Sequence, residues 1–140
     1  MAVASIQALR NGVDEGRGGK AAVLRTAFDP GGRRDERNLE LCEGMIDLAA
    51  ALFNVSSKEL RRSGRSGLAV SRVRQIAMYV AHVGLGLSMN EVARGFGRDR
   101  TTVLYACHLV EDLRDDIEFD RIVAIAERVA DAALGSREDR

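Results

Sequence analysis

The chain has 140 residues, a length that suits one domain, and only one of them is proline. Hydrophobic residues make up 46% and aromatic residues 4%, which allows a core and favours helices over strands. No run approaches the roughly 18 apolar residues of a membrane span, we expect no secretory signal, and a net charge of +0 by itself argues against a nucleic-acid partner.

Glycine and alternating charges dominate residues 11–37, so we expect residues 1–37 to be a mostly flexible N-terminal segment. The stretch "EGRGGKA" has some features of a phosphate-binding loop. However, Asp14 stands where the first glycine of that loop belongs, and Ala21 stands where Ser or Thr would hold magnesium. We therefore expect no nucleotide and no cofactor.

From residue 38 the apolar pattern is helical, with Asn38 as the candidate N-cap and an inner face of Leu41, Met45, Leu48 and Leu52. Ser56 and Glu59 form a capping box that predicts a short helix, which ends in the basic loop "RRSGRSG". The next helix, "SRVRQIAMYVAHV", has an inner face of Val73, Ile76, Ala77 and Val80. Its outward residues are Arg72, Arg74, Gln75 and Tyr79.

A second capping box, Ser88 and Glu91, starts a helix that is predicted to stop at Gly95 and Gly97. Asp99 then caps a helix with an inner face of Val103, Ala106, Cys107, Val110 and Leu113 and an outer face of Arg100, Thr101, Leu104, Tyr105 and His108. A last helix, roughly 118–134, is expected to pack Ile122, Ile125, Ala126 and Val129.

These elements predict an all-α fold, a helix-turn-helix bundle of about five to six helices over residues 38–135, followed by a disordered tail at 136–140. Cys42 and Cys107 lie far apart on apolar helix faces, so we expect two buried thiols rather than a disulfide.

Charge is distributed unevenly along the chain. Residues 58–102 contain nine basic and three acidic groups, a net charge of +6, whereas residues 103–140 contain five and ten, a net charge of −5. A phosphate backbone responds to local charge within a Debye length, so the basic middle favours a nucleic-acid partner.

The helix that follows Asp99 is polarised, with Arg98 and Arg100 at its start and Glu111, Asp112, Asp115 and Asp116 at its end. The acids oppose the helix dipole and do not look placed for stability. A helix that enters a groove by its first turn would present Arg100, Thr101 and Thr102 to bases and keep the acids away from phosphates. Capping alone would explain Asp99 but not the two arginines.

The stretch "SRVRQIAMYVAHVGLGLSMNEVARGFGRDRTTVLYACHLVEDL" resembles the C-terminal DNA-binding domain of the bacterial replication initiator DnaA. That family's signature runs V-A-R-P-R-Q-x-A-M, then S-x-x-E-I, then F-G-G-R-D-H-T-T-V-L-H-A. The resemblance covers about residues 38–134 and implies a stand-alone DNA-binding domain without the ATPase domain. Three positions depart from the signature: Val73 replaces proline, "FGRD" lacks one glycine, and Arg100 replaces histidine.

The resemblance assigns Arg72 to the minor groove and Asp99, Thr101, Thr102 and Leu104 to base reading, to which we add Arg100. The expected phosphate contacts are Arg61, Arg62, Arg65, Arg74, Gln75, Arg98 and His108. We expect no catalytic residue and no metal site, because His82 and His108 lack triad partners and metal-ligand spacing.

The leading hypothesis is a cytoplasmic, nucleoid-associated regulator of transcription or replication that binds double-stranded DNA at DnaA-box-like sites. No heptad seam is visible, so we expect a monomer on DNA, with no membrane or nucleotide partner. The alternative is a protein-interaction module that retains the fold, which the acidic final third would favour.

Overall fold

A computed structural model describes residues 30–135 of the protein, which form six α-helices and one π-helical turn. In chain order these are α3 (Pro30–Phe53), α4 (Ser57–Arg61), α5 (Leu68–Tyr79), the π-helix η1 (Val80–Gly84), α6 (Met89–Phe96), α7 (Arg100–Leu113) and α8 (Ile117–Leu134). Residues 30–135 contain no strand, so the predicted all-α bundle is confirmed. The expected tail at 136–140 lies outside the described residues.

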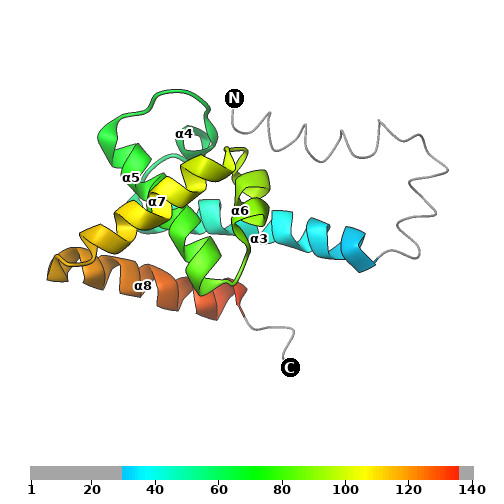
Figure 1. Ribbon diagram of the computed structural model, residues 1–140. Helices are drawn as coiled ribbons and strands as arrows, with labels where there is room; N and C mark the ends of the chain where they lie inside the picture. Colours follow the sequence, from blue (N-terminus) through cyan, green and yellow to red (C-terminus); the bar gives the residue numbers. More distant parts are fainter. Residues whose placement is uncertain (1–29, 136–140) are drawn as a thin grey trace.

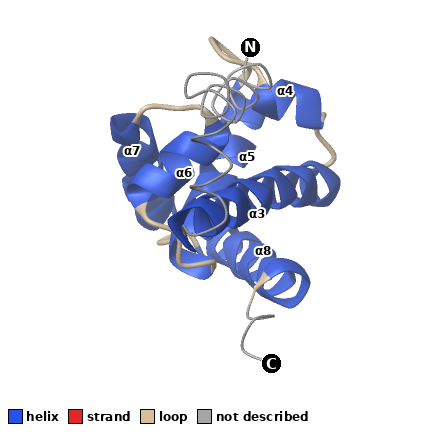
Figure 2. Cartoon of the chain, turned by 90° about the vertical axis from the view of Figure 1, so that its right-hand side faces the viewer, coloured by secondary structure: helices blue, strands red, loops and turns tan. Residues whose placement is uncertain are grey.

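Helix α3 runs through the middle of the bundle (Figure 1), and it contacts α4, α5, α6, α8 and η1. Seen from the side in Figure 2, α8 lies along one flank of α3 while α4 and the loop that follows it lie on the opposite flank. Helix α7 packs against α5 and α6. None of the helices within residues 30–135 meets the length and apolarity that a membrane span requires.

The first helix begins at Pro30, eight residues before the predicted start at residue 38, so the expected flexible segment was wrong for residues 30–37. The remainder, 1–29, lies outside the described residues. Proline suits the first turn of a helix. The added turns are stabilised by contacts with α6 that sequence spacing does not show: Asp35 pairs with Arg94 at 3.4 Å, and the Asn38 amide donates to Glu91 at 2.8 Å. Asn38 is thus not an N-cap.

The core is built from residues of all six α-helices and η1, and it includes both cysteines, which are free and buried as predicted. Burial raises the pKa of the Cys42 thiol to about 12. Two predicted inner faces were partly wrong. Leu52 of α3 is exposed. Ile122 and Ile125 of α8 are exposed as well, and the buried face of α8 is formed by smaller residues: Val123, Ala126 and Ala130.

Helices α3 and α6 approach so closely that Gly95 has no room for a side chain. A Cβ atom on Gly95 would lie 2.3 Å from the Cys42 Sγ and 2.5 Å from its Cβ. Gly95 therefore lies within α6 as a packing residue and does not end the helix, contrary to the prediction. Gly97 alone ends it, in the left-handed conformation at φ 66°.

Replacing Gly95 with Ala should lower the free energy of unfolding by about 1–3 kcal/mol, because overpacking forces the two helices apart. Denaturant unfolding followed by circular dichroism measures the change. Gly67→Ala is the control, since a Cβ there meets nothing within 4 Å, and it should cost under about 1 kcal/mol. Equal losses in the two variants would contradict the packing argument.

Candidate nucleic-acid interface

Helices α6 and α7 form the predicted helix-turn-helix. Ser88 and Glu91 make a reciprocal capping box at the start of α6, as expected. At the end of α6, the Gly97 N–H donates to the Arg94 carbonyl at 3.3 Å and the Arg98 N–H donates to the Ala93 carbonyl at 2.9 Å. This pair of bonds closes the helix on a single glycine. Both closing bonds are thus made although the turn has one glycine fewer than the resembled motif.

The first turn of α7 is open to solvent. Asp99, Arg100, Thr101 and Thr102 are all exposed. Asp99 occupies the N-cap position, but its side chain makes no capping hydrogen bond. Capping therefore does not account for this carboxylate, and the whole turn is available to a ligand.

The predicted inner and outer faces of α7 are confirmed except at Leu113, which is half-buried. The inner residues Val103, Ala106, Cys107 and Val110 are buried. Leu104 is half-buried on the outer side and His108 is exposed. Tyr105 is 63% exposed on the same side as Thr101, one helical turn further on. The sequence pattern placed Tyr105 on this face but did not select it as a contact, although a phenol there could reach a phosphate or a base.

Beside this turn lies the basic loop, residues 62–67, which joins α4 to α5. Arg62 and Arg65 are exposed in it. The Arg62 guanidinium pairs with Glu59 at 3.0 Å on the surface, a weak interaction that a phosphate could replace. Arg61 pairs with Asp47 at 3.2 Å and its side chain is only 15% exposed, so it is less available than predicted.

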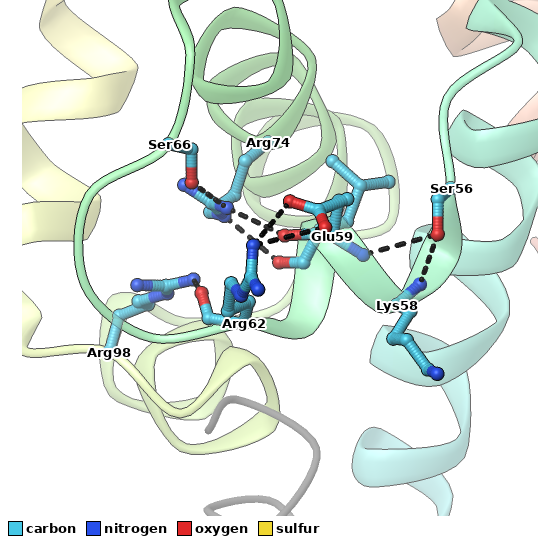
Figure 3. Close-up of polar contacts among 8 residues, drawn as sticks. Ser56, Lys58, Glu59, Arg62, Ser66, Arg74 and Arg98 are labelled. Atoms are coloured by element: carbon cyan, nitrogen blue, oxygen red, sulfur yellow. Dashed lines mark hydrogen bonds and ion pairs between the residues drawn. The ribbon is translucent and has the colours of Figure 1, made fainter.

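Arg74 does not face outward as the sequence predicted. It is 7% exposed. Its Nε donates to the Leu60 carbonyl at 2.9 Å, and its Nη2 donates to the Glu59 carbonyl at 3.0 Å and to the Ser66 Oγ at 2.9 Å (Figure 3). The predicted outward placement was therefore wrong, because the end of α4 presents carbonyl groups that require donors.

Arg98 is half-buried, and part of its guanidinium contacts the protein. Its Nη2 donates to the Arg62 carbonyl at 2.6 Å, and its Nε is buried without a hydrogen-bond partner (Figure 3). Burial lowers the pKa of Arg98, and burial together with the charge of Arg98 lowers the pKa of Arg74 to about 10. We call Arg74 and Arg98 the arginine clamp, since together they hold the basic loop.

Arg72 and Gln75 lie on the first turns of α5. Both are half-buried, and the Arg72 Nη1 donates to the Gln75 Oε1 at 3.1 Å. Each of these two side chains therefore retains an exposed part. The departure at Val73 is a packing feature, because this side chain is buried in the core.

The acids near the end of α7 have structural roles that the sequence interpretation missed. Glu111 accepts a hydrogen bond from the Tyr79 hydroxyl, which is buried rather than outward as predicted. Burial and this bond raise the pKa of Tyr79 to about 12. Asp116 caps α8 by accepting from the backbone of Glu118 and Phe119. Asp112 and Asp115 remain exposed.

Arg114 joins α7 to α8 in the same region. It pairs with Asp120 and with Glu127, and its guanidinium lies 5.7 Å from the centre of the Tyr79 ring. Among residues 30–135, no group of His, Cys, Asp and Glu side chains has the arrangement of a metal site.

Residues 42–110 match the family described as the bacterial DnaA protein helix-turn-helix. Two similar proteins are the chromosomal replication initiators DnaA of Mesorhizobium japonicum, 43% identical over 72 residues, and of Agrobacterium fabrum, 45% identical over 72 residues. Each alignment covers 51% of this chain. It spans only 14% and 15% of the respective relative.

Two solved structures share the fold. A crystal structure of a DNA replication initiation factor superposes on 83% of this chain and 36% of its own, with a TM-score of 0.70 and 25% identity. A replication initiator DnaA bound to AMPPCP and single-stranded DNA superposes on 79% of this chain and 34% of its own, with a TM-score of 0.65 and 24% identity. The second likeness supports the fold alone.

Proposed function

Since residues 42–110 belong to the bacterial DnaA helix-turn-helix family, a membership that implies DNA binding, we propose that this protein recognises specific sites in double-stranded DNA and regulates transcription or replication there. The observation that carries the proposal is the exposed first turn of α7, Arg100 to Thr102, beside a loop that presents Arg62 and Arg65. The nucleoid location expected from the sequence is part of this proposal.

In the proposed complex, α7 enters the major groove by its first turn. Arg100, Thr101 and Thr102 approach base edges with Asp99, and Leu104 offers a surface for a thymine methyl group. Arg72 at the start of α5 enters the adjacent minor groove. Arg62, Arg65, Gln75 and His108 contact phosphates, which set the register of the protein on the duplex.

The protein-interaction alternative loses part of its support. It rested on the acidic final third, yet Glu111 and Asp116 have partners inside the protein. All four acids at the end of α7 are nevertheless exposed: Glu111, Asp112, Asp115 and Asp116. A partner protein that binds them would not require the open turn at Arg100.

The test is a binding selection on random duplexes, compared directly with a DnaA box, followed by affinity measurements over a range of salt concentrations. We expect an enriched site, and an affinity that falls steeply with salt because each phosphate contact releases about 0.9 of a counterion. Binding without enrichment, or an affinity that is insensitive to salt, would favour the interaction module.

Arginines of the basic loop and of α5 should affect binding in different ways. Arg62→Ala and Arg65→Ala should weaken binding to all duplexes similarly and lower the salt slope by about one per lost contact. Arg72→Ala should instead erode the preference for A/T-rich sequence, because a narrow minor groove attracts arginine. Selection profiles that are identical for Arg62→Ala and Arg72→Ala would refute this division.

Arg100 should contribute base specificity. It is exposed at the first position of α7, where the resembled motif has histidine, and a guanidinium can donate two hydrogen bonds to guanine. Removing it should cost about 1–3 kcal/mol on the preferred site and much less on unrelated DNA. Arg100→Ala and Arg100→His are compared on a site library at fixed salt. A uniform loss, with the base preference unchanged, would make Arg100 a phosphate contact.

A further inference from the structure

The basic loop is held at both ends by the arginine clamp. At its start, the Arg62 carbonyl accepts a hydrogen bond from Arg98, which belongs to the turn between α6 and α7. Near its end, the Ser66 hydroxyl accepts from Arg74 of α5, whose guanidinium also binds the last carbonyls of α4. Figure 3 shows the Arg98 guanidinium directed toward the loop backbone at Arg62, and the Arg74 guanidinium directed toward the Ser66 side chain and the end of α4. The loop therefore bridges the helix-turn-helix and the first turns of α5.

These two elements carry the residues that are proposed to contact bases: Arg100 and its neighbours, the major-groove reader, and Arg72, the minor-groove reader. Arg98 lies two residues before Arg100, and Arg74 lies two residues after Arg72. A displacement of either clamp residue would change the distance between the start of α7 and the start of α5. When two binding elements are held at a fixed distance, binding of the first brings the second close to its own site. The total affinity then depends on how well the distance between them matches the DNA.

We propose that Arg74 and Arg98 are positioning residues, which fix the spacing between the major-groove reader and the minor-groove reader, and that neither contacts phosphate. This inference rests on the proposed function. Its support is the direction of the side chains: Arg74 is 7% exposed, with three acceptors inside the protein. The Nε of Arg98 is buried, while its Nη2 is bound to a carbonyl.

A positioning role and a phosphate contact predict different patterns of loss. Loss of a phosphate contact weakens all duplexes equally and reduces the salt slope by about 0.9. Loss of a clamp residue leaves the number of released counterions unchanged, and so the salt slope does not change. It reduces affinity only where both readers must engage together, because only there does the spacing contribute.

The experiment compares the wild type with Arg98→Ala and Arg98→Gln. Glutamine has no charge but retains a hydrogen-bond donor. The probes are a duplex with the site recovered by selection, the same duplex with its A/T-rich half replaced by G·C pairs, and an unrelated duplex. The affinity of Arg98→Ala should fall on the order of tenfold for the complete site and under about twofold for the G·C-substituted duplex and the unrelated duplex. The salt slope should be unchanged. Arg98→Gln should retain more of the affinity than Arg98→Ala.

Two arginines serve as matched controls. Arg94→Ala removes an arginine of α6 that pairs with Asp35 of α3, and it should leave all three affinities unchanged. Arg62→Ala should give the uniform loss and the lower slope of a phosphate contact. If Arg98→Ala gives the Arg62→Ala pattern, or if Arg98→Gln is as weak as Arg98→Ala, the positioning role is wrong.

A readout without DNA makes the test independent of the proposed function. Amide hydrogen exchange over residues 62–67 should become faster in Arg98→Ala, with the exchange of α8 unchanged, because the loop loses its bond to the turn. Unchanged loop exchange would overturn the inference. Failure of the wild type to bind any duplex in a salt-dependent manner would instead remove the proposed function, and the exchange result would still stand.

Discussion

The buried guanidinium of Arg74 is the constraint on which the candidate interface depends. Helix α4 has five residues, too few to satisfy its own terminal carbonyl groups. Arg74 donates to the Glu59 and Leu60 carbonyls and to Ser66 beyond them. Of these acceptors, the Leu60 carbonyl lies in the buried bond, and leaving it unpaired would cost about 1–3 kcal/mol; the Glu59 carbonyl also accepts from the Arg62 N–H at 3.3 Å. One side chain of α5 thereby fixes the end of α4 and the path of the basic loop, and Arg98 connects that loop to the start of α7.

The orientation of α6 depends on close packing rather than on polar contacts. Gly95 lets the backbone of α6 approach Cys42 of α3, and the Glu91 carboxylate extends this contact by accepting from Asn38. Glu91 thus serves the capping box of α6 and the packing of α3 at once. Because α7 follows α6 after a turn of three residues, 97–99, the α3–α6 interface also orients the exposed turn at Arg100.

The sequence predicted the helices and the open turn of α7 well, because capping boxes and 3.6-residue periodicity are local signals. It failed where the outcome depends on tertiary contacts. Arg74 and Tyr79 were placed outside because a periodicity argument treats every arginine and phenol as polar, without regard to the carbonyls and carboxylates that meet them inside. Ile122 and Ile125 were placed inside together with Ala126 as one apolar helix face, yet α8 buries Ala126 with Val123 and Ala130 instead. The N-terminal turns of α3 depend on α6, which no local pattern can show.

A chain with no net charge can still present a basic surface, because several of its acidic groups are bound within the protein while a group of its arginines is exposed. In the acidic final third, Glu111 accepts from Tyr79, Asp120 and Glu127 pair with Arg114, and Asp116 caps α8. Carboxylates that are held in this way at the far end of α7 cannot move to neutralise the start of that helix. There, Arg100 and the loop arginines Arg62 and Arg65 remain exposed, and local charge within a Debye length, rather than the sum over the chain, governs the encounter with phosphates. The separation of the acids from the start of α7, along a helix of 14 residues, therefore leaves the basic region of a neutral protein open to a polyanion.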